Sequence, residues 1–203
     1  MDMRKAIVLL AALLLTAFST LPTQAENTPS TALVVVFSHA GENWQVGVIE
    51  EGNTMKMAKI IAEQLNADLL EIVPEVPYPV DYAAVKDAAQ EELDQDARPA
   101  YVGDVEHWNE YETVLIGYPI WWGGMPKIVE HFLEKHDFSG KTVIPFNTHG
   151  GSGQGGTQAV IERMLPEATV LQGLAITGTQ AQNHAEKTRS DVTNWLTRLG
   201  LIQ

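Results

Sequence analysis

The sequence predicts an α/β protein built on a parallel sheet. Five short apolar segments, rich in β-branched residues, alternate along the chain with segments that have the apolar spacing of a helix. The apolar segments are nearly continuous hydrophobic runs, which is typical of strands buried on both faces. The length of 203 residues suits a single domain. This alternation favours right-handed strand–helix–strand crossovers within that domain.

The five strands are justified in chain order by their composition and by the loops after them. The first, ALVVVFS, leads into a long glycine-containing loop over residues 39–54, and the last is interrupted by Gly173. The expected strands span residues 32–38, 68–73, 113–117, 142–146 and 170–176. Pro74, Pro77 and Pro79 come after the second strand and should exclude regular structure there, because proline cannot donate a backbone hydrogen bond.

The helices are predicted from apolar stripes and end signals. Asp81 is placed to cap the second helix, Thr157 to start the fourth, and Gly200 to stop the last. The expected helices span residues 55–65, about 82–95, 127–135, 157–164 and 181–199. Residues 96–110 form an acidic, irregular connection. In the doubly wound strand order 2-1-3-4-5, with helices on both faces, the loops after strands one, three and four would converge where ligands bind.

The amino-terminal residues have the features of a secretory signal peptide. Arg4 and Lys5 precede an apolar run over residues 6–18, which is shorter than the roughly 20 residues needed to span a bilayer. Small residues precede a cleavage site after Ala25. We expect export to the periplasm or medium, a linker over residues 26–31, and a folded domain over 32–203 with no membrane span. The alternative is an amino-terminal membrane anchor.

Composition excludes several classes of function. The chain has no cysteine, which rules out disulfides, thiolate metal sites and cysteine nucleophiles, and its six histidines lack a metal-binding spacing, so we expect no metal. The net charge of −13 repels nucleic acid and anionic lipid. It favours a partner protein with a basic docking face, although the charge is equally explained by solubility.

The segment YPIWWGGMP, residues 118–126, comes directly after the third strand. An exposed indole at the carboxyl end of a buried strand is a platform for a flat aromatic ligand, and the two glycines allow close approach of the backbone. We interpret this segment as one wall of a flavin site. The alternative is that both Trp121 and Trp122 belong to the core, which is more plausible for one indole than for two.

The loop after the first strand predicts a neutral phosphate cradle. Ser38, Asn53 and Thr54 bring hydroxyl and amide groups to a helix start, and no Lys or Arg lies between Ser38 and Thr54. This suits a bound mononucleotide better than phosphoryl transfer, which requires a lysine and Mg²⁺. Alternatively, Asn53 or Thr54 only caps the helix. Within the inserted residues 42–51, Trp44 would cover the ligand, contact a second subunit, or pack on a surface hairpin.

The loop after the fourth strand, residues 147–156, is the richest in glycine. Gly151, Gly153 and Gly156 match a dinucleotide-binding pattern, but the pattern comes after the wrong strand and no acidic residue lies near Ile176. A loop that runs close to a planar ring explains the glycines as well. His149 could hydrogen-bond that ring or act as an acid, or it could be an ordinary exposed loop residue.

Four motifs together resemble the flavodoxin-like family, and in particular exported members with longer loops. They are VFSHAG at 36–41, GNT at 52–54, GYPIWWG at 117–123 and PFNTHGGSG at 145–153. The resemblance covers about residues 31–201 and implies a flavodoxin fold that binds FMN without a covalent bond. The insertion at 42–51 splits the usual compact phosphate loop, which leaves the roles of residues 39–43 open.

The resemblance also implies the binding residues. Ser38, Asn53 and Thr54 would hold the phosphate, whereas residues 119–123 and 148–153 would flank the isoalloxazine. The full expected set is Ser38, His39, Ala40, Gly41, Asn53, Thr54, Pro119, Ile120, Trp121, Trp122, Gly123, Thr148, His149, Gly150, Gly151, Ser152 and Gly153.

Three functions remain open from the sequence. The first is an electron carrier with a redox partner protein. The second is a small FMN-dependent oxidoreductase acting on a quinone or NAD(P)H, for which a homodimer could complete the substrate pocket. The third is a binding module that keeps the fold and has lost the flavin.

Overall fold

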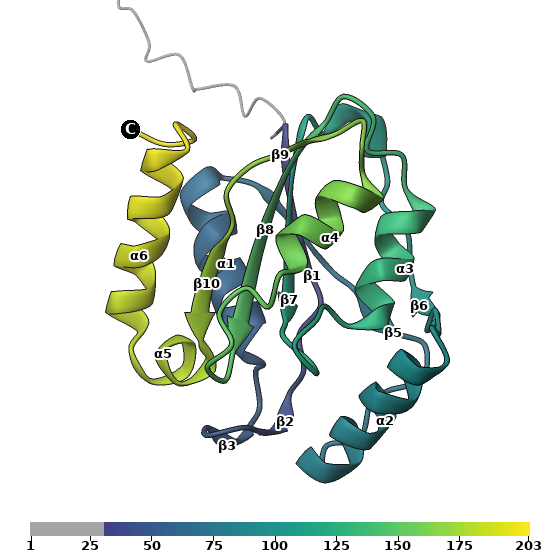
Figure 1. The fold of residues 1–203 in the computed structure, drawn as a ribbon. Helices are drawn as coiled ribbons and strands as arrows, with labels where there is room; N and C mark the ends of the chain where they lie inside the picture. Colours follow the sequence, from purple (N-terminus) through teal and green to yellow (C-terminus); the bar gives the residue numbers. More distant parts are fainter. Residues whose placement is uncertain (1–30) are drawn as a thin grey trace, which may run out of the picture.

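The computed structural model describes residues 31–203, so the expected signal peptide and most of the linker lie outside the described part. Its centre is a parallel sheet in the order β10-β8-β7-β1-β4, with β9 also paired to β8 (Figure 1). The strands are β1 (Ala32–Val36), β4 (Asp68–Glu71), β7 (Thr113–Pro119), β8 (Thr142–His149), β9 (Thr169–Val170) and β10 (Leu174–Thr177). When β1, β4, β7, β8 and β10 are numbered one to five in chain order, their order across the sheet is 2-1-3-4-5, as predicted.

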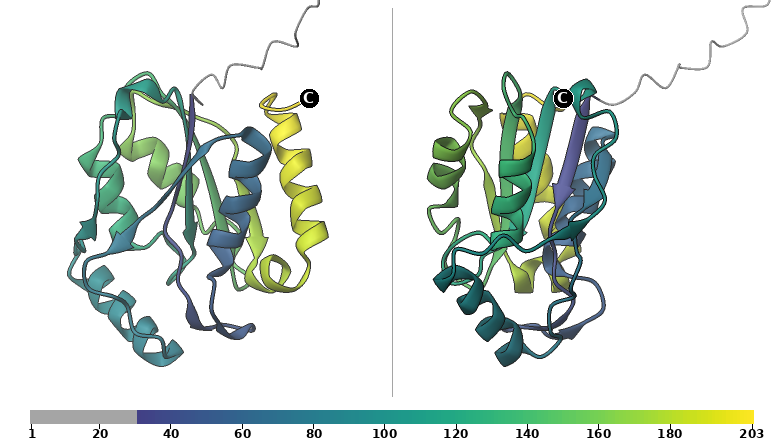
Figure 2. Two further views of the ribbon diagram at one scale, coloured as in Figure 1. Left: turned by 180° about the vertical axis from the view of Figure 1, so that it is seen from behind. Right: turned by 90° about the vertical axis from the view of Figure 1, so that its right-hand side faces the viewer.

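Helices cover both faces of the sheet, as the two views in Figure 2 show. The helices are α1 (Asn53–Leu65), α2 (Tyr82–Asp94), α3 (Lys127–Lys135), α4 (Thr157–Met164), α5 (Gly178–Asn183) and α6 (Ala185–Arg198). In β1, Val34 and Val36 pack toward α1 and α6, whereas Val35, together with Phe37 just after the strand, packs toward α3 and α4. Both sets are buried because successive side chains of a strand point to opposite faces.

The carboxyl ends of β7 and β8 extend further than predicted. The two strands pair from Thr113↔Thr142 to Pro119↔Thr148, and the N–H of Ile120 donates to the carbonyl of Thr148 at 2.8 Å. The sequence placed Thr148 and His149 in a loop, but both belong to β8. These residues are therefore held by strand pairing rather than by a flexible connection.

The prediction of one carboxyl-terminal helix over 181–199 is wrong. The chain forms α5 and α6, separated at His184, whose φ of −133° and ψ of 61° are not helical. Thr177 caps α5 by accepting the N–H of Gln180, so helix formation starts earlier than the apolar pattern suggested. Thr157 does not cap α4 either, because the N-cap is Gly156.

Short antiparallel pairs form in two connections. The first is the hairpin that was one alternative for residues 42–51, and the second involves residues that were expected to be irregular. β2 (Gly41–Asn43) pairs with β3 (Gly47–Ile49), and β5 (Val73–Pro74) pairs with β6 (Tyr101–Val102). A short 3-10 helix (Trp108–Glu110) comes after β6. The expectation that proline excludes regular structure fails at Pro74, because a two-residue ladder tolerates a missing N–H. Figure 1 shows α2 and the β2–β3 hairpin beyond the carboxyl ends of the sheet.

Candidate functional site

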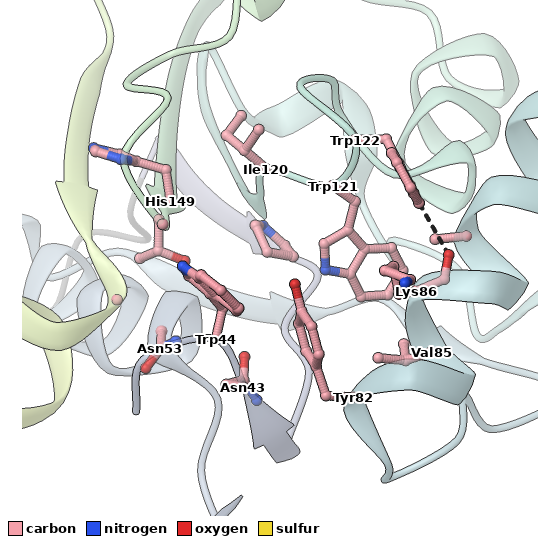
Figure 3. Close-up of a pocket in the computed structure, with 15 residues that line it drawn as sticks. Asn43, Trp44, Asn53, Tyr82, Val85, Lys86, Ile120, Trp121, Trp122 and His149 are labelled. Carbon is pink, nitrogen blue, oxygen red and sulfur yellow. Dashed lines mark hydrogen bonds between the residues drawn. The ribbon is translucent and has the colours of Figure 1, made fainter. Parts of the chain in front are cut away.

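A cleft of about 250 Å³ lies at the carboxyl end of the sheet. Its walls come from the β2–β3 hairpin, the starts of α1 and α5, α2, the segment after β7, and the end of β8 (Figure 3). The residues that line it are Asn43, Trp44, Asn53, Tyr82, Val85, Lys86, Ala89, Pro119, Ile120, Trp121, Trp122, Thr148, His149, Gly150 and Gly178. Lys86 is the only charged residue among them apart from the titratable His149, which makes the cleft mainly aromatic and neutral.

The start of α1 forms one end of the cleft. Gly52 is the N-cap and supplies no side-chain cap, which excludes the alternative that Asn53 or Thr54 serves as the N-cap residue. The hydroxyl of Ser38 accepts the N–H of Met55 at 3.0 Å. The earlier N–H groups of the first turn have no intrahelical acceptor. A Cβ on Gly52 would collide with the Ser38 hydroxyl, so glycine is needed for this close approach.

Thr54 and Asn53, at this end of the cleft, differ in whether their side-chain oxygens have a hydrogen-bond partner. The hydroxyls of Thr54 and Thr148 hydrogen-bond each other at 2.7 Å, and both residues are buried. Asn53 is also buried, but its Oδ1 has no hydrogen-bond partner. A buried, unpaired amide oxygen costs roughly 1–3 kcal/mol, so such an atom in a cleft wall points to a missing donor.

The segment after β7 makes a tight turn instead of staying extended. The N–H of Trp121 donates to the carbonyl of Gly124 at 3.0 Å, and the N–H of Gly124 donates to the carbonyl of Trp121 at 2.9 Å. The two residues between them, Trp122 and Gly123, have φ values of 51° and 77°. These are the features of a type I′ turn, which requires positive φ at both central residues. The Trp121 indole is half-buried against Phe37, with ring centroids 5.3 Å apart.

The second indole has a different role. Trp122 is 51% exposed, and its Nε1–H donates to the carbonyl of Lys86 in α2 at 2.9 Å (Figure 3). The two adjacent tryptophans therefore face different surroundings, one partly packed on the core and one bridging to a helix. Both line the cleft.

The β8–α4 loop is ordered by its own hydrogen bonds. The N–H of Gly151 donates to Nδ1 of His149 at 2.9 Å, which places the proton of the neutral imidazole on Nε2. Burial lowers the pKa of His149. Gly151, Gly153, Gly155 and Gly156 all have positive φ, so the backbone conformation itself accounts for much of the glycine content.

The structure brings together about half of the residues expected from the sequence. The cleft is lined by Asn53, Pro119, Ile120, Trp121, Trp122, Thr148, His149 and Gly150. Ser38, Thr54, Gly123, Gly151, Ser152 and Gly153 lie in the same segments but do not line it.

The early part of the first loop turns toward α2. His39 donates through Nε2 to the carbonyl of Pro79 at 2.8 Å, and burial lowers its pKa although this hydrogen bond opposes the shift. Ala40 is exposed, and Gly41 packs directly on Val80, where a Cβ would lie 2.7 Å from the carbonyl oxygen. These residues therefore hold the segment before α2 and do not form a cleft wall.

Sequence reasoning missed the contribution of α2. Tyr82, Val85, Lys86 and Ala89 line the cleft at helical positions i, i+3, i+4 and i+7, which is one face of a helix. The helical spacing of these residues was visible in the sequence, but no neighbouring motif indicated that this face of α2 lines the cleft. Gly178 of α5 was also missed. A Cβ there would lie 2.7 Å from Nδ2 of Asn53.

Comparisons with known proteins agree with this architecture. A sequence model described as flavodoxin matches residues 48–199, which is more than half of the chain. The chain belongs to the flavodoxin family. A comparison with curated proteins found no match.

Solved structures of flavoproteins resemble this flavodoxin-family chain. A proposed flavoprotein from Bacteroides eggerthii is 29% identical, with a TM-score of 0.65 over 83% of this chain and 97% of that one. A proposed flavoprotein from Bacteroides uniformis is 28% identical, with a TM-score of 0.64 over 84% and 99%. A Lactobacillus acidophilus flavoprotein in complex with FMN is 21% identical, with a TM-score of 0.58 over 81% and 97%.

Within residues 31–203, no His, Asp and Glu side chains gather in a group able to hold a metal ion. No helix in the same range is long and apolar enough to cross a membrane.

Proposed function

We propose that this protein binds FMN without a covalent bond and transfers electrons through it. The observation that carries the proposal is the buried, unpaired Oδ1 of Asn53 in the wall of an aromatic cleft at the carboxyl end of a doubly wound sheet. Membership of the flavodoxin family supports a flavin, and the Lactobacillus acidophilus relative was solved with FMN.

The residues present fit both ends of FMN. Asn53 and the open first turn of α1 offer hydrogen-bond donors to a phosphate or ribityl group, and the positive end of the helix dipole favours an anion there. The unpaired Oδ1 of Asn53 would accept from a ribityl hydroxyl. Trp121, Trp122 and Tyr82 offer the flat apolar surfaces that a planar ring requires.

Bound FMN would supply the redox chemistry, and the chain would bind it, orient it and limit its access to water. His149 holds a proton on Nε2 at neutral pH, since Nδ1 is occupied by the N–H of Gly151. Burial lowers its pKa, so this residue is a neutral hydrogen-bond donor at the edge of the cleft. A basic partner protein remains our proposal for an electron carrier, on the ground of the net charge of −13.

A small FMN-dependent oxidoreductase is the second candidate function. The wall formed by α2 favours it, because a carrier needs little more than an exposed ring edge, whereas an enzyme encloses its quinone or NAD(P)H. Steady oxidation of NAD(P)H by the purified flavoprotein, without a partner, would support this candidate. A light-scattering mass would show whether a homodimer accompanies the activity.

The test of FMN binding is a visible absorption spectrum of residues 26–203 before and after addition of FMN and desalting. A retained, red-shifted flavin band is expected. A folded sample that retains no flavin would refute the proposal and favour a flavin-free binding module. We also propose export with cleavage after Ala25, which amino-terminal sequencing of the secreted protein would test by finding Glu26 first.

A further inference from the structure

The β2–β3 hairpin is attached to the start of α2 by backbone contacts and one carboxylate. The N–H of Glu42 donates to the carbonyl of Val80 at 2.7 Å, and its Oε2 accepts the N–H of Tyr82 at 3.0 Å. Gly41, with a φ of 99°, lets the strand approach Val80 more closely than a Cβ would allow. The inserted segment therefore holds the start of α2 in place and is not an independent surface hairpin.

Glu42 complements the cap that α2 already has. Asp81 accepts the N–H of Ala84 at 2.9 Å, and Glu42 accepts from the first helical residue, Tyr82. Two carboxylates at a helix amino terminus are favoured by the helix dipole. Since Tyr82 lines the cleft, the carboxylate of Glu42 fixes the backbone from which the Tyr82 ring projects.

The aromatic residue of the hairpin, Trp44, also contacts the cleft wall. The Trp44 ring lies 5.8 Å from the Tyr82 ring, with 32° between the planes. Its other edge rests on Gly150, where a Cβ would lie 2.6 Å from Cδ1 of Trp44. Figure 3 shows Trp44 and Tyr82 side by side, with Asn53 on one side and Lys86 on the other.

Trp44 is 57% exposed although it contacts two other elements of the site. Because more than half of the ring is exposed, its burial contributes little hydrophobic stabilisation in the ligand-free protein. It would gain more by contacting a planar ligand in the cleft that it lines.

We propose that Trp44 and Tyr82 are binding residues that contact the flavin ring, and that Glu42 is a positioning residue that holds Tyr82 in place. The proposal rests on FMN as the ligand. It assigns the insertion at 42–51 the role of a clasp that slows the release of a non-covalent cofactor.

The experiment measures FMN release from the loaded protein after dilution, by the recovery of flavin fluorescence. Trp44→Ala should release FMN about two- to tenfold faster, because an aromatic pair contributes roughly 0.5–1.5 kcal/mol beyond its buried area. Trp44→Phe should restore most of the retention. The fluorescence of bound FMN should also rise in Trp44→Ala, since an adjacent indole quenches it.

The role of Glu42 is tested by substitution in two backgrounds. Glu42→Ala should release FMN several-fold faster, whereas Glu42→Gln keeps an acceptor for the N–H of Tyr82 and should stay close to wild type. Glu50→Gln is the matched control, because Glu50 is exposed and has no side-chain partner in the described structure. In a Tyr82→Ala background, Glu42→Ala should have little further effect if it acts through the Tyr82 ring.

The outcomes separate this inference from the proposed function. A wild-type protein that binds no FMN would refute both. A wild-type protein that retains FMN, with Trp44→Ala and Tyr82→Ala equally retentive, would overturn the clasp alone. An effect of Glu42→Ala that persists undiminished without the Tyr82 ring would overturn the positioning role. Thermal unfolding of each FMN-free variant identifies any loss that comes from misfolding.

Discussion

Replacing Asn53 with leucine should stabilise the ligand-free protein while weakening FMN binding. The Oδ1 atom of Asn53 is buried without a partner, and leaving it so costs roughly 1–3 kcal/mol. Leucine removes that cost and is a good helix former at the start of α1.

The magnitude converts into a measurable shift. For a chain of this size, 1 kcal/mol corresponds to about 2–4 °C in the unfolding midpoint, so Asn53→Leu should raise it by about 2–12 °C. The affinity for FMN should fall about two- to tenfold, because a hydrogen bond between neutral groups, here the Oδ1 of Asn53 and a ribityl hydroxyl, contributes roughly 0.5–1.5 kcal/mol. Calorimetry of the FMN-free protein and fluorescence titration with FMN measure the two effects separately.

Asn194→Leu is the matched control, because Asn194 is exposed on α6. It makes the same change in helix propensity away from the cleft, which is worth less than about 0.7 kcal/mol. It should leave FMN affinity unchanged. An Asn53→Leu protein that is less stable than wild type, or that binds FMN equally well, would refute the interpretation of Asn53 as a ligand-facing group.

Two further predictions concern the sheet and the glycine loop. Gly117→Ala should lower the free energy of unfolding in urea by about 1–3 kcal/mol, because its Cβ would collide with the Phe146 ring. Gly124→Ala is the control and should leave the free energy of unfolding nearly unchanged, because the nearest atom to its Cβ would be 3.8 Å away. The pKa of His149 should be below 6.5 by NMR, because burial disfavours the charged imidazole. The unfolded chain therefore binds more protons at low pH, and the contribution of neutral His149 to stability is lost as the pH falls below 6.5. Protonation would also remove the acceptor of the Gly151 N–H, so the protection factor of that amide, measured relative to its intrinsic exchange rate at each pH, should fall over the same range. A pKa of His149 at or above 6.5 would contradict this prediction.

The fold was predictable because its signals are local. Continuous apolar runs indicated the strands, and motifs after strands one, three and four indicated their convergence, which the observed strand order matches. The break at His184 was not predictable, because the apolar pattern of 181–199 continues through it. The start of α5 was also not predictable, because this helix begins at Gly178, directly after β10, and is capped by Thr177.

The candidate site was predictable only where its residues come from the motifs between a sheet strand and the helix that follows it. The strand-end motifs contribute Asn53, Trp121 and Thr148, whereas the wall from α2 arises through contacts between residues about 40 positions apart. The N–H of Tyr82 and the carboxylate of Glu42 are one such pair. The role of this carboxylate as an acceptor became visible only in three dimensions.

Charge and shape together indicate where the binding energy must come from. The loop proposed to hold the phosphate has no lysine or arginine between Ser38 and Thr54, and the whole chain carries −13, so the long-range field would oppose an incoming phosphate. Hydrogen bonds at the start of α1 and the partial positive charge of the helix dipole would orient a phosphate without a fully charged partner. Contacts with the ring must therefore supply most of the affinity. A chain with this charge balance has the most to gain from extra aromatic walls, and Trp44 and Tyr82 are placed where such walls would act.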